Sequence, residues 1–241
     1  LWPARHAGVA ELHLLDVGQG DALALRTPRG RWVLVDAGRA WRGGDAGART
    51  VVPWVRRRGG DVALLVLTHP HADHVGGAAT VLRRLRPALS GGSLDYAGFG
   101  RVRFLLTGDA EAPEEAWLLA RARAALAVAE ALRADVLKVA HHGSATSTTP
   151  AFLAAVRPRL ALVSVGRDNG YGHPHGTVVA RLRAAGATVL RTDRLGAVVV
   201  RTDGVGITVD AGGATWQVRS GERATAGRRP GGARSPRSSA R

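Results

Sequence analysis

The sequence predicts an α/β fold in which helices pack on both faces of mixed β-sheets. Short apolar segments bounded by turns alternate with helical patterns through the middle of the chain, whereas both ends favour hairpins. The 241 residues are enough to bury the core of one substantial domain. Because no apolar run approaches the roughly 20 residues that span a bilayer, we expect this domain to be soluble by itself.

The N-terminal part is expected to form three strands and a helix. Residues 11–16, 21–27 and 32–36 are apolar segments separated by glycine-containing turns, a pattern typical of short strands joined by tight connections. A stretch rich in Gly and Arg follows, in which residues 48–58 are compatible with a short basic helix.

A buried strand and a second helix are expected next. Residues 62–67 form a nearly continuous apolar run, which indicates a strand buried on both faces. Residues 75–85 place apolar side chains at helical spacing with arginines on the other side, and Pro87 ends this helix. Residues 88–100 are rich in Gly and Ser, so we expect a loop there, before a strand at 102–107.

The C-terminal half continues the alternation. Residues 111–134 are alanine-rich and helical in pattern, and residues 135–140 form another apolar strand segment. The remaining expected elements are a helix near 150–156, a strand at 160–163, a helix at 177–185, a strand at 188–190 and paired strands at 196–209. Residues 219–241 hold seven arginines and one glutamate without apolar periodicity, so we expect a disordered basic tail after a domain that spans 1–218.

Composition limits the chemistry. The chain has no cysteine, which excludes disulfides and thiolate ligands, so any metal is held by nitrogen and oxygen atoms. The net charge of +15 comes from arginines, Lys138 being the only lysine, and indicates a polyanionic partner or an anionic membrane surface, unless it reflects codon usage alone. Since there is no methionine and no signal-peptide pattern at Leu1-Trp2-Pro3, we expect a piece of a longer protein.

The strongest functional signal directly follows the buried strand at 62–67. His69, His71, Asp73 and His74 place four metal-ligand side chains within six residues. We expect the first two to reach one ion and the last two to reach a second ion. A chance histidine-rich loop is the alternative, and the concentration of polar groups beside an apolar strand argues against it.

Two further strand ends carry the same residue types. Asp109 follows the strand at 102–107, a position where ligands collect in α/β sheets, although Gly-Asp also forms ordinary turns and helix caps. His141 and His142 follow the next strand. We expect His141 to ligate a metal and His142 and Ser144 to contact the substrate; two structural histidines in a polar turn are the alternative.

Candidate substrate contacts lie in the glycine-rich loop 166–175. Arg167, Asn169 and His173 suit substrate binding there, and His173 is a candidate to protonate a leaving group or to bind a phosphate oxygen. A purely structural loop is the alternative. Asp36, at the end of an early strand, is a candidate to orient a metal-bound histidine from behind, or an ordinary turn residue.

Together these motifs resemble the metallo-β-lactamase superfamily, whose signature is a His-x-His-x-Asp-His loop followed by a bridging Asp and a final His. The residues that match this signature in order are His69, His71, Asp73, His74, Asp109 and His141. More narrowly, segments 15–21, 138–144 and 164–174 resemble the C-terminal hydrolase domain of ComEC-type competence proteins. The resemblance covers roughly residues 8–203.

The resemblance implies a four-layer αββα sandwich with two divalent cations, manganese or zinc, at the strand tips. It further implies that Asp109 bridges the cations, that Asp73 takes part in catalysis, and that DNA is the substrate. By the same resemblance the domain accompanies a membrane channel for DNA uptake in a bacterial plasma-membrane protein. Two features differ from the family: residues 75–108 contain no histidine, and the segment from Pro87 to Arg103 is short. A hydrolase of another ester or amide, or a catalytically impaired nucleic-acid-binding domain, are the alternatives.

Overall fold

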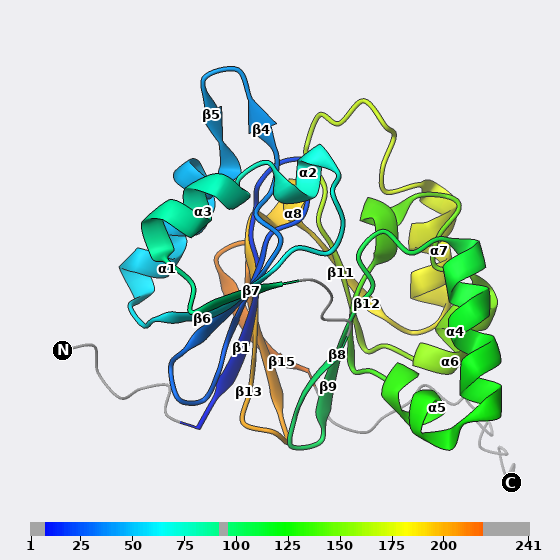
Figure 1. The fold of residues 1–241 in the computed structure, drawn as a ribbon. Coiled ribbons are helices and arrows are strands. Elements are labelled where there is room, and N and C mark those ends of the chain that lie inside the picture. The colour runs from blue at the N-terminus through cyan, green and yellow to red at the C-terminus, as the bar shows by residue number, and fades with distance from the viewer. Residues whose placement is uncertain (1–7, 92–95, 219–241) are drawn as a thin grey trace, which may run out of the picture.

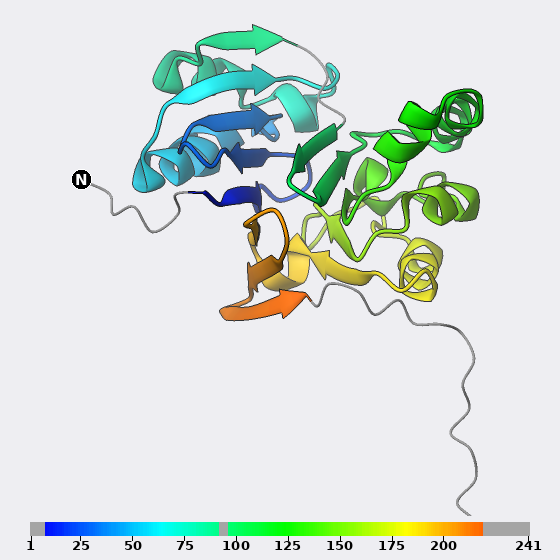
Figure 2. The ribbon, with the colours of Figure 1, turned by 90° about the horizontal axis from the view of Figure 1, so that it is seen from below.

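The computed structural model describes residues 8–91 and 96–218, which form a four-layer αββα sandwich. Two sheets face each other, and each carries helices on its outer face (Figures 1 and 2). The architecture predicted from the sequence is therefore confirmed. The basic tail expected at 219–241 lies outside the described residues.

The larger sheet contains strands from both ends of the described chain. Its strand order is β15-β14-β13-β1-β2-β3-β6-β7, antiparallel from β15 to β3 and parallel from β3 to β7. The bounds are β1 (Ala10–Leu14), β2 (Leu23–Arg26), β3 (Trp32–Val35), β6 (Val62–Val66), β7 (Leu89–Gly91), β13 (Val198–Thr202), β14 (Ile207–Ala211) and β15 (Ala214–Val218).

The smaller sheet contains the strands that end in the later motifs. Its order is β12-β11-β10-β9-β8, parallel except for the antiparallel β8–β9 pair. The bounds are β8 (Tyr96–Phe99), β9 (Val102–Leu106), β10 (Val136–Lys138), β11 (Leu160–Val163) and β12 (Thr188–Arg191). Because β9, β10 and β11 are parallel, the residues that follow each of them meet at one edge.

Helices cover the outer face of each sheet (Figure 2). The larger sheet packs against a π-helical turn η1 (Gly47–Val51), α1 (Val52–Arg58) and α3 (Ala78–Leu85). The smaller sheet packs against α4 (Ala112–Ala124), α5 (Leu126–Leu132), α6 (Pro150–Val156) and α7 (Gly176–Ala184). Short elements complete the chain: the hairpin β4 (Ala40–Trp41) and β5 (Gly44–Asp45), α2 (Ala72–Val75), the 3₁₀ turn η2 (Ala140–Gly143) and α8 (Thr192–Leu195).

The central core lies between the two sheets. Leu12 and Leu14 of β1 belong to the same buried cluster as Phe104 and Leu106 of β9 and Leu162 of β11. Each such side chain stabilises the fold by about 1.5–3 kcal/mol relative to its exposed state. This shared core holds the two sheets together and so fixes the strand ends of one against those of the other.

The structure differs from the sequence expectations at several places, of which three concern the main sheets and helices. The loop predicted for 88–100 is wrong, because β7 and β8 lie there; each is an edge strand that forms by pairing with a neighbour, and neither has an apolar pattern of its own. The helix predicted for 111–134 is interrupted at Ala125, whose backbone is extended. The strand β15 follows the last predicted pair of strands.

Among the described helices, none combines the length and the apolar character that crossing a membrane requires.

Candidate metal centre

The loop between β6 and α3 carries the first four predicted ligand residues. Its base is fixed by Asp36, which follows β3 and accepts the Thr68 backbone N–H at 2.9 Å and the Thr68 hydroxyl at 2.8 Å. The same carboxylate accepts a hydrogen bond from His74 Nδ1 at 2.7 Å. With Nδ1 held in this way, Nε2 of His74 faces Asp109.

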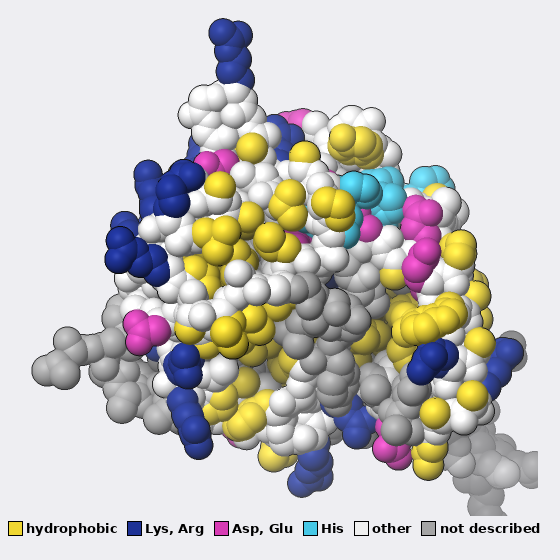
Figure 3. Space-filling model, in the orientation of Figure 1, with side chains coloured by type: hydrophobic (Ala, Val, Ile, Leu, Met, Phe, Trp, Pro, Cys, Tyr) yellow, Lys and Arg dark blue, Asp and Glu magenta, His cyan; other side chains and the backbone are white. Residues whose placement is uncertain are grey.

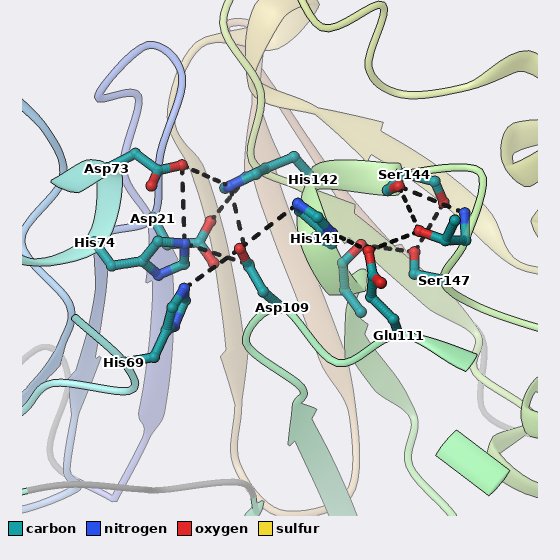
Figure 4. Close-up of polar contacts among 12 residues, drawn as sticks. Asp21, His69, Asp73, His74, Asp109, Glu111, His141, His142, Ser144 and Ser147 are labelled. Atoms are coloured by element: carbon teal, nitrogen blue, oxygen red, sulfur yellow. Dashed lines mark hydrogen bonds and ion pairs between the residues drawn. The ribbon is translucent and has the colours of Figure 1, made fainter. Parts of the chain in front are cut away.

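Asp109, which follows β9, lies at the centre of a cluster of ligand-type side chains (Figure 4). Its Oδ1 lies 3.2 Å from His74 Nε2, and its Oδ2 lies 3.4 Å from His69 Nε2. Three groups have their ligand atoms within 4.8 Å of one another: His69, His71 and Asp109; Asp73, His74 and His142; and Asp21, His74 and Asp109. Asp109 therefore lies between two neighbouring positions at which a cation could bind.

The electrostatics of the cluster favour positive charge. Burial opposes the charged form of His74, but the carboxylates of Asp109 and Asp36 outweigh burial and raise the pKa of His74 to about 10. Contact with His142 lowers the pKa of Asp73 to about 2. Burial would raise the pKa of Asp109, but the neighbouring His74 lowers it overall. The ionised carboxylates that favour a proton on His74 would equally attract a metal cation in its place.

Five buried atoms of the cluster have no hydrogen-bond partner among the described residues: His69 Nε2, His74 Nε2, His142 Nε2, Asp109 Oδ1 and Asp21 Oδ1. Buried polar atoms are nearly always paired in folded proteins. Imidazole nitrogens and carboxylate oxygens are ligands of zinc and manganese. The donor set therefore fits divalent cations, and histidine and acidic side chains gather at this end of the molecular surface (Figure 3).

The two adjacent histidines after β10 have side chains that face different partners. Both have a positive φ in the turn η2, 47° for His141 and 53° for His142, which is uncommon for residues other than glycine. His142, expected from the sequence at the substrate, lies with Nε2 3.2 Å from Asp73 Oδ2. His141, expected as the ligand, lies at the rim of the cluster, its solvent-exposed edge. Its Nε2 lies 3.9 Å from Asp109 Oδ2. The structure thus groups His142, and not His141, with Asp73 and His74.

Glu111 contacts His141 and was not singled out from the sequence. Its Oε1 lies 2.7 Å from His141 Nδ1 and accepts the Thr146 hydroxyl at 2.7 Å. The hydrogen bonds from Thr146 and His141 lower the pKa of Glu111. The only sequence signal at this position is that of a helix start, since Glu111 and Glu114 form a capping box at the N-terminus of α4.

A buried ion pair lies beneath His142. Lys138 Nζ lies 2.7 Å from Asp21 Oδ2, and both side chains are almost fully buried. His142 Nδ1 donates to the Ser164 carbonyl at 2.9 Å and lies 3.4 Å from Asp21 Oδ1. Burial would raise the pKa of Asp21, but the charge of Lys138 lowers it overall. Asp21 was not singled out from the sequence; the structure brings it into the cluster.

Of the residues predicted to contact the substrate, some lie at the rim of the cluster and others lie away from it. The ring of His173 lies 5.8 Å from that of His141, and Asn169 hydrogen-bonds the backbone N–H and carbonyl of His173 at 3.0 and 2.8 Å. Arg167 is exposed and donates to the Asp193 carbonyl. Ser144 is buried and its hydroxyl contacts Thr146 at 2.8 Å. The structure therefore does not bring Ser144 into the cluster around Asp109.

Comparison with known proteins shows what the chain is similar to. Residues 15–100, which include the His69–His74 motif, match the family model described as the metallo-beta-lactamase superfamily. The chain is 32% identical to Recombination protein 2 of Haemophilus influenzae over 71% of its length, 29% identical to Competence protein ComA of Neisseria gonorrhoeae over 75%, and 27% identical to ComE operon protein 3 of Bacillus subtilis over 75%.

These alignments cover 26%, 30% and 31% of the respective relatives, so the chain spans only about a quarter to a third of their length. The αββα fold, the order of the ligand-type residues along the chain and their convergence on Asp109 agree with the family match. Residues 15–100 of the chain are similar to the metallo-β-lactamase superfamily, and the chain as a whole is similar to one segment of the larger competence-type proteins.

Proposed function

We propose that this chain is a metal-dependent hydrolase domain that cleaves the phosphodiester bonds of DNA during DNA uptake. The observation that carries the proposal is the convergence of imidazole and carboxylate groups on Asp109, with five of their buried atoms lacking a hydrogen-bond partner among the described residues. The similarity to Competence protein ComA and its relatives supports DNA as the substrate, and the surplus of arginine agrees with a polyanionic ligand.

The geometry supports one division of the ligands. His69, His71 and Asp109 would hold one divalent cation; Asp73, His74 and His142, with Asp109, would hold the second. Manganese and zinc both accept this donor set. Divalent cations bound there would lower the pKa of a water molecule and neutralise charge that develops on phosphoryl oxygens. This division replaces His141 by His142 among the ligands expected from the sequence.

The remaining residues act around the ligands. Asp36 holds His74 from behind and Glu111 holds His141, so neither imidazole turns freely. His141 and His173 lie at the open rim, where either can hold a proton at the leaving oxygen or contact a phosphate. Burial and the neighbouring charge of His141 lower the pKa of His173, so near pH 7 its neutral imidazole would contact a phosphate oxygen through its N–H group.

The deciding experiment adds manganese or zinc to chelator-treated protein and measures cleavage of single- and double-stranded DNA. Asp73→Asn removes one ligand charge while keeping the side-chain shape, and the exposed Asp203→Asn is the matched control. We expect metal-dependent cleavage by the wild type and by Asp203→Asn, and loss of cleavage with Asp73→Asn.

Two other outcomes would replace the proposal. A folded protein that binds two cations without cleaving DNA would be a hydrolase of another ester or amide. A folded protein that binds DNA but no metal would be a catalytically impaired nucleic-acid-binding domain. We also propose that the domain accompanies a membrane channel in a longer protein, since its competence-type relatives are three to four times longer than the matched segment.

A further inference from the structure

A cleft of about 560 Å³ opens beside the metal centre. Its walls are the hairpin β4–β5 and the loop after β11, which rise at the same end of the molecule (Figure 1). The volume lies within the roughly 300–1,000 Å³ of sites that hold one small organic molecule. The charged and aromatic side chains that line it are Arg39, Trp41, Arg49, Arg167, Asp16 and Asp168.

Both walls of the cleft connect to the metal centre. On one side, the segment from Gly18 to Asp21 continues from the cleft floor to Asp73, since the Asp21 N–H donates to the Asp73 carbonyl at 3.1 Å. The hairpin packs on the same loop, because Gly76 lies so close to Ala40 that a side chain would not fit. On the other side, Asn169 holds the backbone of His173. An elongated ligand lying in the cleft would lead directly to the rim of the candidate metal centre.

Trp41 offers a flat surface to this cleft. Trp41 is 37% exposed, and its indole lies over Gly44, its partner across the hairpin; a methyl group at Gly44 would come within 3.2 Å of the indole nitrogen. The glycine therefore lets one part of the indole rest on the backbone while the other part stays open. An exposed tryptophan held in this way can stack on an unpaired base.

The arginines of the cleft are available to a ligand. Arg39 and Arg49 are exposed, and neither pairs with a carboxylate within residues 8–91 and 96–218. Arg167 donates a hydrogen bond to the Asp193 carbonyl at 3.3 Å and forms no ion pair with a carboxylate of the described residues. Guanidinium groups bind phosphate oxygens through pairs of N–H donors. The cleft thus combines phosphate-binding groups with a stacking surface.

We infer that this cleft binds a short single-stranded segment of nucleic acid, with one base on Trp41 and adjacent phosphates at the arginines, and directs that strand to the metal centre. The inference rests on the proposed function. A single strand fits better than a duplex because a duplex keeps its bases stacked on each other and carries twice the charge per length. Asp16 and Asp168 in the cleft walls would repel such a dense line of phosphates.

The test measures binding of fluorescently labelled oligothymidine to the full chain by anisotropy, with chelator present so that cleavage does not occur. We expect Trp41→Ala to weaken binding about tenfold, since stacking contributes on that order per base, and Trp41→Phe to restore most of it. The exposed Trp117 on α4 provides the matched control, because Trp117→Ala also removes a surface indole.

Salt dependence separates the two kinds of contact. We expect Arg49→Ala to reduce the slope of log affinity against log salt by about 0.7, whereas Trp41→Ala leaves the slope unchanged. Arg183→Ala on α7, an exposed arginine away from the cleft, is the control and should alter neither quantity. Melting temperatures establish that each variant is folded.

The inference would be overturned if Trp41→Ala bound as tightly as Trp117→Ala, or if a duplex of equal length competed as well as the single strand. These outcomes are independent of the nuclease proposal. Trp41-dependent binding without any metal-dependent cleavage would refute the nuclease activity and leave the cleft in place. Metal-dependent cleavage that Trp41→Ala leaves unchanged would support the nuclease activity and refute the role of the cleft.

Discussion

His74 Nδ1 lies 2.7 Å from Asp36 Oδ2, and both side chains are buried where β3 and β6 end side by side. The contact fixes the plane of the imidazole and leaves Nε2 directed at Asp109, 3.2 Å away. Partners of this kind, which hold a ligand from behind, typically change metal affinity by about 10–100-fold when they are removed.

We therefore expect Asp36→Asn to weaken metal binding by about 10–100-fold, because the amide no longer supplies a charged acceptor to His74 and Thr68. Titration calorimetry with manganese or zinc measures the affinity. Asp203→Asn, at an exposed carboxylate, should bind metal as the wild type does. Equal affinity in the two variants would remove Asp36 from any role at the metal centre.

The adjacent histidines of η2 should respond differently to substitution. His142→Ala removes an imidazole that the structure groups with Asp73 and His74, so we expect it to bind one divalent cation fewer per chain than the wild type. His141→Ala should keep the wild-type stoichiometry and reduce the rate of hydrolysis by about 10²–10⁴-fold, the usual effect of losing a positioned proton donor. Elemental analysis of dialysed protein gives the stoichiometry. If His141→Ala lost a cation and His142→Ala did not, the metal ligand would be His141, as the sequence predicted.

Lys138→Met should destabilise the fold by about 3–5 kcal/mol, because it leaves the carboxylate of Asp21 buried without its partner. The double variant Asp21→Asn/Lys138→Met removes both charges and should regain part of this loss. Urea unfolding of chelator-treated protein measures both free energies without a contribution from metal. A cost below about 1 kcal/mol for the single variant would mean that the ion pair is not required for folding.

Acid stability should depend on Glu11, which lies outside the candidate metal centre. Burial would raise the pKa of this carboxyl, but contacts with His13 and Arg201 lower it from 4.5 to about 2. A lowered folded-state pKa means that the ionised carboxylate stabilises the protein above pH 4.5, and that this contribution is lost as the pH falls towards 2. The contribution amounts to about 2–3 kcal/mol.

Glu11→Gln should therefore be less stable than the wild type at pH 7, and the difference should shrink between pH 4.5 and 2. Denaturant unfolding at a series of pH values in the presence of chelator measures this difference without interference from metal release. A difference that does not change over this range would show that Glu11 acts through packing and not through its charge.

The sequence by itself determined the layer architecture and the residue types at the strand ends. Apolar runs such as Val62–Val66 and Leu160–Val163 are local patterns, and a strand buried on both faces has to be apolar along its length. The six-residue motif from His69 to His74 is local as well, so its chemistry could be recognised before any packing was known.

Only the tertiary structure decided which side chains meet. The edge strands β7 and β8 exist because neighbouring strands offer backbone partners, and no local period marks them. The choice between His141 and His142 depends on two positive φ angles within η2, and the contact of Lys138 with Asp21 joins residues more than a hundred positions apart. Turn conformation and long-range contact are set by packing of the whole chain, whereas sequence spacing reports only which residues are near one another along it.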